Sequence, residues 1–418
     1  MTGKDEGQGR GDPFKIVYFN PTGTLGGAEL CLLDVVAGVR AGRPEWSIKV
    51  LLADDSPVRD ALERLGIACE VLPIPSRLAA AGDSDTTSNS RLGKLLKLST
   101  TLPSALGYFL KVRRALRDER PGLLQTNGMK AHLLGAWGAP KGVPVVWQMH
   151  DYPGSRPLMA RLLKISRRPG LRVVAVSKSV ADATKALLGP SVPVDCVYNA
   201  IDLERFSPVL GDRETDPGAW LDDLAGLPPA PPGTVRVGLV ATYARWKGHD
   251  LFLDAAARVT PSPRVRFYVV GGPIYRSAGS QFSREELESK AKSLGLDGRV
   301  GFVPHQGEPA KAFRSLDVVV HASTRPEPFG RVIVEAMACG RALIAMQEGG
   351  AAELFEDGVS ALGCPPNDPD ALADRLQRLI VSSDLRAALG QEGRKATLAY
   401  FNRNRLGSEW IRVYQAFR

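Results

Sequence analysis

The sequence lacks the features of a secreted or membrane-spanning protein. Its five cysteines are odd in number, scattered through apolar sequence and without a Cys-x-x-Cys pair, so we expect reduced core residues. No apolar run reaches the about eighteen residues that a membrane-spanning helix needs. The first residues, MTGKDEGQGRGDP, have no apolar core of a signal peptide. We therefore expect a cytoplasmic protein.

Two phosphate-binding signatures are also missing, and the one possible metal motif lacks the context of a metal site. The glycine-rich turn at 23–27 is not Gly-x-Gly-x-x-Gly, and no Lys-Ser or Lys-Thr follows it to form a P-loop. The segment 82–90, GDSDTTSNS, contains an Asp-x-Asp, but no β-rich run precedes it and its composition is that of a polar loop. We predict no catalytic metal and no cofactor.

The length and the order of apolar runs favour two α/β domains. A chain of 418 residues exceeds one ordinary core, and its net charge of +9 favours anionic partners without separating nucleotide-sugars, acidic lipids and nucleic acid. Short β-rich runs alternate with helical segments, which predicts parallel sheets. The predicted strands are 14–19, 48–52, 69–72, 123–126, 143–149, 172–176, 194–197, 235–240, 264–270, 300–303 and 318–321.

Residues 323–340, STRPEPFGRVIVEAMACG, form the most informative stretch. Apolar residues recur at helical spacing up to Gly340, which stands where a left-handed C-terminal cap is favoured. Glu327 precedes the predicted helix, and Glu335 lies about one turn inside it. Free backbone N–H groups flanked by carboxylates suit a ligand with an anion and hydroxyl groups, such as a sugar nucleotide.

Other candidates follow predicted strands, where parallel sheets bind ligands. Gly26 and Gly27 lie in the turn after the first strand, and His150 follows the strand 143–149. Each has a structural alternative: close packing of helix on strand for the glycines, and a satisfied structural side chain for the histidine. Arg245 and Lys247 precede a helix after the strand 235–240. They can meet a diphosphate or can be solvated basic residues.

EPFG and EAMACG, around the two glutamates, resemble the E-x7-E signature of the retaining family 4 glycosyltransferases. The resemblance runs from residue 14 to the C-terminus, and GGAE at 26–29 and the Gly-Gly pair at 349–350 add to it. It implies the GT-B fold, in which two Rossmann-like doubly wound parallel-sheet domains face a cleft and a C-terminal helix crosses back to the N-terminal domain. The implied parts are an acceptor-binding domain (14–205), a linker (206–233), a nucleotide-sugar-binding domain (234–395) and the returning helix (396–418).

The resemblance also implies roles for individual residues. Lys247 and Arg245 would stabilise the leaving phosphate, Glu327 would bind the donor sugar, and Glu335 would bind the ribose. The implied catalytic residues are His150, Glu327, Lys247 and Arg245. The implied donor-binding residues are Gly26, Gly27, Arg245, Lys247, Gly272, Val303, Glu327, Phe329, Gly330 and Glu335. The family has an arginine where this chain has Thr242, which leaves open whether Arg245 replaces it.

The implied function is transfer of a hexose, with retention and without metal, from a nucleotide diphosphate sugar to an acceptor. UDP is the preferred nucleotide and GDP the second. A saccharide, a lipid-linked or a small-molecule acceptor fits, in cell-surface glycan or glycoconjugate biosynthesis, and nucleic acid is not an expected partner. The alternative is a sensor or scaffold of the same fold that binds nucleotide-sugars without catalysis.

Two basic segments leave a membrane contact open. Residues 91–120 mix leucines with lysines and arginines, and 161–168 adds a second cluster. This pattern is typical either of a helix with a solvated basic face or of peripheral attachment to an anionic membrane.

Overall fold

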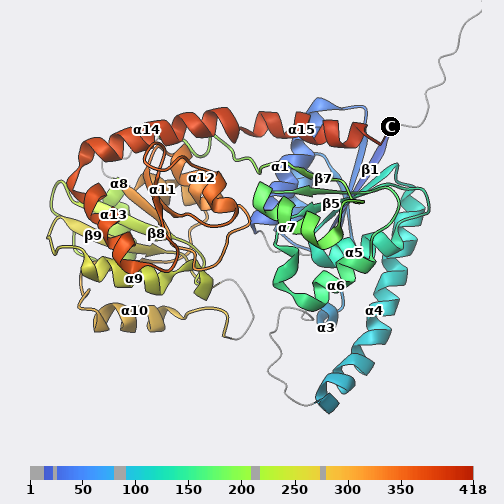
Figure 1. The fold of residues 1–418 in the computed structure, drawn as a ribbon, viewed down its shortest axis with the longest axis horizontal. Helices are drawn as coiled ribbons and strands as arrows, with labels where there is room; N and C mark the ends of the chain where they lie inside the picture. Colours follow the sequence, from blue (N-terminus) through green and yellow to red (C-terminus); the bar gives the residue numbers. More distant parts are fainter. Residues whose placement is uncertain (1–13, 22–25, 80–90, 209–216, 274–278, 418) are drawn as a thin grey trace, which may run out of the picture. The chain divides into compact units, whose positions relative to one another are not determined.

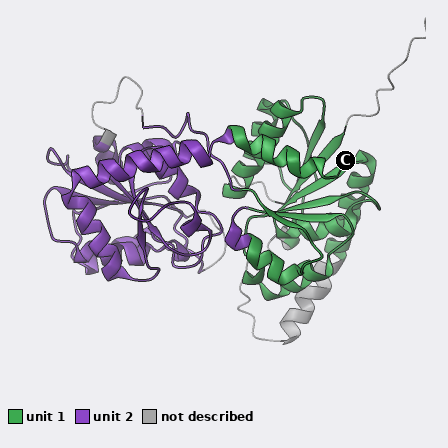
Figure 2. Ribbon diagram, turned by 45° about the horizontal axis from the view of Figure 1, so that its top comes forward, with its two compact units in different colours: residues 1–175, 181–197, 404–418 green, residues 176–180, 198–403 purple. Residues whose placement is uncertain are grey.

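A computed structural model describes residues 14–21, 26–79, 91–208, 217–273 and 279–417. The chain divides into two compact units (Figure 2). Unit 1 comprises residues 1–175, 181–197 and 404–418, and unit 2 comprises residues 176–180 and 198–403. The predicted Asp-x-Asp loop at 82–90 lies outside the described residues.

Unit 1 contains a parallel sheet of seven strands in the order β3-β2-β1-β4-β5-β6-β7 (Figure 1). Its central strands β4 and β5 are buried along their whole length, and the polar residues of β4, Gln125, Thr126 and Asn127, are buried with the apolar ones. The order of strands reverses between β1 and β4, so the switch point lies at the carboxyl ends of these two strands. The strands are β1 (Lys15–Asn20), β2 (Ser47–Leu52), β3 (Ala68–Val71), β4 (Leu123–Asn127), β5 (Val145–Met149), β6 (Leu171–Ala175) and β7 (Val194–Cys196).

Unit 2 contains a second parallel sheet, of six strands in the order β10-β9-β8-β11-β12-β13. Its switch point lies between β8 and β11. The prediction of two doubly wound parallel sheets is confirmed. The strands are β8 (Val235–Val240), β9 (Val265–Val270), β10 (Val300–Val303), β11 (Val318–His321), β12 (Ala342–Met346) and β13 (Leu362–Cys364).

The sequence analysis missed β12 and β13. The first is the five-residue apolar run ALIAM and the second has three residues. ALIAM has no alternation of polar and apolar residues that separates a buried strand from a buried piece of helix, and β13 is too short to show one.

The helices connect the strands in the usual alternation. None in the described part of the chain is long and apolar enough to cross a lipid bilayer. The first half holds α1 (Gly27–Gly42), α2 (Pro57–Arg64), α3 (Ser76–Ala79), α4 (Arg91–Glu119), α5 (Met129–Gly138), η1 (Pro153–Ser155), α6 (Pro157–Ile165) and α7 (Lys178–Leu188). The second half holds α8 (Pro217–Ala225), η2 (Arg245–Lys247), α9 (His249–Arg258), α10 (Arg284–Ser293), α11 (Pro309–Arg314), α12 (Arg331–Ala338), η3 (Gly350–Glu353), α13 (Pro369–Val381), α14 (Ser383–Tyr400) and α15 (Arg403–Gln415).

The last helix, α15, packs on unit 1, whereas α14 belongs to unit 2. The Tyr414 hydroxyl lies 3.0 Å from that of Tyr18 in β1, and it also donates to the side chain of Gln125 in β4. A Cβ atom on Gly407 would lie 2.5 Å from the carbonyl oxygen of Gly38, so α15 and α1 approach each other closely because both contact positions are glycine.

Residues 217–233, in the second part of the segment that the resemblance implied as a linker, belong to unit 2. Helix α8 packs on β10 and buries Asp222. The Asp222 carboxylate pairs with Arg266 at 2.7 Å and with Arg236 at 3.2 Å, and accepts the Tyr268 hydroxyl. Nothing in the composition of this segment indicated that Asp222 finds partners on strands β8 and β9.

Candidate functional site

Four side chains meet at the switch point of unit 2. Lys247, at the end of η2, forms an ion pair with Glu327, in the loop between β11 and α12. Ser323 Oγ donates to Glu327 Oε1 at 2.6 Å, and His321 Nε2 lies 3.6 Å from the same oxygen. We call Lys247, His321, Ser323 and Glu327 the Glu327 cluster. It places a cation, a carboxylate and a hydroxyl beyond two central strands, where parallel sheets bind ligands.

Gly248 explains how Lys247 reaches Glu327. Its φ is +75°, and a Cβ atom there would lie 1.8 Å from the carbonyl oxygen of Ala322. The loop after β8 therefore passes against the end of β11 only because the residue after Lys247 has no side chain. The backbone N–H of Thr324 donates to the Trp246 carbonyl at 2.8 Å and fixes the two loops together.

The Gly-Gly pair at 349–350 supports the backbone of Glu327. The N–H of Gly350 donates to the Glu327 carbonyl at 2.8 Å. A Cβ atom on Gly350 would lie 2.0 Å from the carbonyl oxygen of Pro328. Glycine is therefore required at position 350 for a structural reason, since any larger residue would displace the loop that carries Glu327.

The Glu327 carboxylate is ionised at neutral pH. Its side chain is only 12% exposed, and burial alone would raise its pKa, but the Lys247 ammonium opposes burial and holds the pKa of Glu327 well below its usual range. A buried, charged carboxylate is a strong acceptor for hydroxyl groups.

Glu335 lies inside α12 and is buried. Burial raises its pKa, and Arg331, one turn earlier with its Nε 3.3 Å from the carboxylate, partly counters that shift. The helix starts after Gly330, which has φ +88°. It ends as predicted, because Gly340 has φ +66° and the N–H groups of Gly340 and Arg341 donate to carbonyls of the last turn.

Phe329 is a core residue of unit 2. It is 3% exposed, and its ring centroid lies 6.4 Å from that of Tyr198 and 6.1 Å from that of Phe401. Its side chain packs in this aromatic group, so the role expected near a donor falls to its backbone.

Arg245 does not join the Glu327 cluster. Its guanidinium pairs with Glu286 of α10 at 2.7 Å and lies 4.2 Å from the ring centroid of Phe282. It also donates to the Gly279 carbonyl at 3.1 Å. The structure thus brings Lys247 to Glu327 and holds Arg245 against α10.

Gly272 lies in the loop after β9, and Val303 is the last residue of the neighbouring strand β10. The N–H of Gly271 donates to the Val303 carbonyl at 2.9 Å, and the N–H of Tyr243 donates to the Gly272 carbonyl at 3.0 Å. Val303 has no exposed surface, so its side chain belongs to the core. These bonds tie the ends of β8, β9 and β10 together.

In unit 1, His150 lies beyond β5 and is partly buried. Its Nε2 contacts Asn127 Oδ1, and Asn127 Nδ2 donates to Asn20 Oδ1 at 2.8 Å. Because Asn127 donates to Asn20, its oxygen faces His150 and accepts from Nε2–H. Desolvation lowers the pKa of His150 to about 4, so the imidazole is neutral at pH 7.

Gly26 and Gly27 begin α1. The N–H of Gly26 donates to Glu29 Oε2 at 3.1 Å, in the pattern of a capping box. The amide that the resemblance placed near the donor phosphates is thus bonded to a carboxylate of the chain itself.

Two family models match the chain. The model described as "Glycosyl transferases group 1" matches residues 229–396, and the model described as "Glycosyltransferase Family 4" matches residues 58–205, so each half is matched. The chain belongs to the family 4 glycosyltransferases.

Curated relatives of this family 4 chain include D-inositol 3-phosphate glycosyltransferases. That of Salinispora arenicola is 32% identical over 296 residues, covering 65% of this chain and 63% of the relative. That of Mycobacterium ulcerans is 34% identical over 192 residues, covering 46% of this chain and 38% of the relative. The matches span less than two thirds of the relatives' own length.

Solved structures share the fold. Anabaena HepE in complex with UDP-glucose is 25% identical, with a TM-score of 0.76 over 96% of this chain and 99% of that one. Sucrose-phosphate synthase of Thermosynechococcus elongatus is 20% identical, with a TM-score of 0.72 over 96% and 98%. These likenesses establish the GT-B fold predicted from the sequence.

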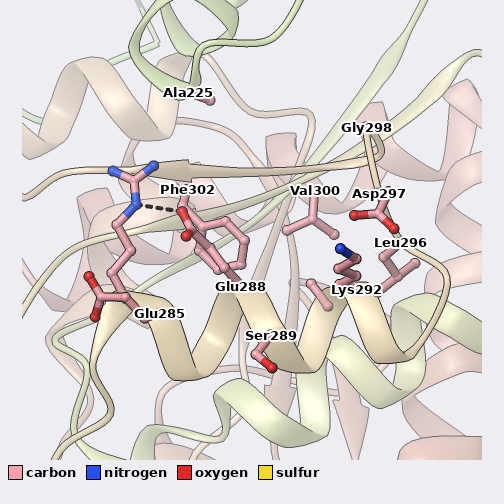
Figure 3. Close-up of a pocket in the computed structure, with 12 residues that line it drawn as sticks. Ala225, Glu285, Glu288, Ser289, Lys292, Leu296, Asp297, Gly298, Val300 and Phe302 are labelled. Atoms are coloured by element: carbon pink, nitrogen blue, oxygen red, sulfur yellow. Dashed lines mark hydrogen bonds and ion pairs between the residues drawn. The ribbon is translucent and has the colours of Figure 1, made fainter.

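A hollow of about 490 Å³ lies elsewhere on unit 2 (Figure 3). It runs beside α10 and β10, and an ion pair of 2.7 Å joins Arg284 to Glu288 there. None of its lining residues belongs to the Glu327 cluster or to the donor-binding residues that the resemblance implied. The lining residues are Ala225, Arg284, Glu285, Glu288, Ser289, Ala291, Lys292, Leu296, Asp297, Gly298, Val300 and Phe302.

The sequence analysis did not single out His321, Ser323, Asn20 or Asn127. His321, Asn20 and Asn127 each end a strand next to a switch point. A search for polar residues at the ends of otherwise apolar strands would have found these three. Ser323 lies in the stretch 323–340 that the sequence analysis singled out, but no pattern there pointed to the serine itself.

Proposed function

We propose that this protein transfers a hexose, with retention and without metal, from a nucleotide diphosphate sugar to an acceptor held by unit 1. UDP is the preferred nucleotide and GDP the second. The observation that carries the proposal is the pairing of Lys247 with the ionised Glu327 at the switch point of unit 2. The cation is suited to the diphosphate and the carboxylate to the hydroxyls of the sugar.

Lys247 would stabilise the charge that develops on the leaving phosphate. Glu327 would orient the sugar, and Glu335 would accept hydrogen bonds from the ribose. The proposed chemistry is attack by the acceptor hydroxyl on the face that the phosphate leaves, with the phosphate taking the hydroxyl proton. His150, neutral at pH 7, would act as a hydrogen-bonding group beside the reacting sugar.

The names of similar proteins narrow the donors and acceptors to be tested. HepE is described in complex with UDP-glucose, and the curated relatives are named for D-inositol 3-phosphate. We therefore propose UDP-glucose as the first donor and an inositol phosphate as the first small-molecule acceptor, beside saccharides and lipid-linked acceptors.

Incubation with a panel of UDP- and GDP-sugars, read by mass spectrometry of released nucleotide, tests the proposal. A transferase releases nucleotide slowly to water and faster with its acceptor, and the rate is unchanged by EDTA. A sensor or scaffold is protected against thermal unfolding by the same donors without releasing nucleotide. The anomer of the product decides between retention and inversion.

We further propose that unit 1 touches an anionic membrane through α4. This helix buries Tyr108, Val112 and Leu116 at helical spacing, and it leaves Leu106 and Leu110 more than half exposed. Exposed leucines beside arginines are the combination that binds an anionic lipid surface.

A further inference from the structure

His321 is a buried imidazole next to the Glu327 carboxylate. It ends β11, its side chain is 5% exposed, and its Nε2 lies 3.6 Å from Glu327 Oε1. Neither ring nitrogen has a hydrogen-bond partner within the part of the chain that the structure describes. Buried polar atoms are rarely left in this condition, so the position calls for a functional explanation.

Among the described residues, two charged groups are recorded at His321, and they form a pair. Glu327 faces it from its own loop, and Lys247 approaches from the loop after β8 to pair with the same carboxylate oxygen. The neighbouring strand β12 places Ala345 beside His321, and β8 places Leu239 beside the preceding residue. On α12, Arg331 and Glu335 pair with each other. Any change at Lys247 therefore acts on His321 through Glu327.

Binding of a diphosphate would disturb this arrangement. A ligand that draws the Lys247 ammonium toward phosphate leaves Glu327, a side chain only 12% exposed, without its strongest partner. A buried charge that loses its counter-ion is strongly destabilising. Imidazole is the side chain that changes charge between pH 5 and 8. By binding one proton from solvent, His321 can therefore replace Lys247 as the positively charged partner of Glu327.

We propose that His321 is a positioning residue and the second partner of Glu327: when the donor diphosphate draws Lys247 away, His321 takes up a proton and holds the carboxylate ionised and oriented. No covalent bond changes in this step, and the proton comes from solvent. The inference deepens the proposed function and rests on it, because it requires a diphosphate at Lys247. It predicts that donor binding and protonation of His321 favour each other.

Calorimetry with UDP-glucose in buffers of different ionisation enthalpy tests the proposal. The diphosphate of this probe is esterified at both ends, so it lacks the phosphomonoester group that titrates near pH 6. The wild-type protein should take up close to one proton for each UDP-glucose bound at pH 8, and its affinity should fall about tenfold from pH 7 to pH 8. His321→Gln, which keeps a hydrogen-bond donor but cannot take a proton, should bind without proton uptake and with an affinity that is flat over this range.

A purely structural role for His321 would leave the proton count unchanged. Absence of proton uptake in the wild type, or equal uptake in His321→Gln, would therefore overturn the proposal. Failure of any nucleotide-sugar to bind would instead overturn the proposed function. Uridine, which lacks the diphosphate, is the matched ligand control and should bind without uptake.

A second measurement needs no ligand. In Lys247→Met, Glu327 has lost its lysine before any binding, so ¹⁵N NMR over a pH series should find the His321 imidazolium persisting to higher pH in the variant than in the wild type. An unchanged titration of His321 in this variant would contradict the proposal even if His321→Gln failed to fold.

Discussion

Replacing Lys247 by methionine should destabilise unit 2 in a pH-dependent way. The change keeps most of the apolar stem but leaves Glu327, 12% exposed, without its ammonium partner. Breaking a fully buried pair costs about 3–5 kcal/mol. Because the Lys247 side chain is 24% exposed and water can partly replace it, we expect about 2 kcal/mol. For a unit of this size that corresponds to a fall in melting temperature of about 4–8 °C.

The sign of the pH dependence follows from the pKa of Glu327. In the wild type this pKa is lowered, so the pair stabilises the fold above the unfolded pKa of about 4.3, and this stability is lost as the pH falls through the lower folded pKa. In Lys247→Met, burial acts with less opposition and raises the pKa of Glu327. The variant's deficit should thus be largest near pH 8 and shrink toward pH 5, where a proton taken up by His321 or by the carboxyl group itself compensates the buried negative charge.

Thermal melts of four proteins measure this effect: wild type, Lys247→Met, Glu327→Gln and the double variant. In the Glu327→Gln background, Lys247→Met should cost little, because no buried charge is left behind. If Lys247→Met lowered the melting temperature equally in both backgrounds, or equally at pH 5 and pH 8, the ion pair would not be the cause.

Three other predictions address binding. Glu335→Ala should weaken the affinity for free UDP measured by calorimetry. Glu327→Ala should lower turnover and leave the UDP affinity nearly intact, since the contacts of Glu327 are with the transferred sugar. Equal losses of UDP affinity in the two variants would refute this division of roles. Arg245→Met should lower the UDP affinity less than Lys247→Met does, because Glu286 already holds Arg245, and a larger loss would show that Arg245 turns toward the phosphates. Reversal of three basic residues of α4 should abolish salt-sensitive co-sedimentation with anionic vesicles, and absence of wild-type binding at low salt would exclude membrane contact. These three are Arg113, Arg114 and Arg117.

Much of the fold could be predicted because its signals are local. The strands 235–240, 300–303 and 318–321 have the bounds that the sequence indicated. Each is a short apolar run bounded by polar residues or turns, which fixes both its type and its ends. Glu327 and Lys247 could be named because each precedes a predicted helix and stands where the resembled family has functional residues. The structure adds that each lies close to a glycine that the loop geometry requires: Gly330 before α12 and Gly248 after η2.

The remaining site depends on contacts between distant residues. Arg245 and Lys247 are two residues apart and chemically alike, yet one meets Glu286 and the other Glu327. That difference arises because Gly248 bends the chain toward β11 after Lys247, while Arg245 still lies on the side of α10. A sequence pattern cannot distinguish Arg245 from Lys247 in this respect, because it does not show which carboxylate each side chain contacts.

The groups expected to bind the donor are neutralised by partners from the chain. Lys247 pairs with Glu327, Arg245 with Glu286, and the Gly26 amide bonds to Glu29. Neither Lys247 nor Arg245 is therefore a bare cationic site for the diphosphate. A free phosphate that drew Lys247 away would weaken its ion pair with Glu327, and the cost would offset part of the gain. A nucleotide-sugar avoids this cost, because its hydroxyls donate to the carboxylate while its diphosphate meets the ammonium. The pairing of Lys247 with Glu327 therefore favours binding of the complete donor over binding of its fragments. It predicts that pyrophosphate binds with a lower affinity than its negative charge alone would give.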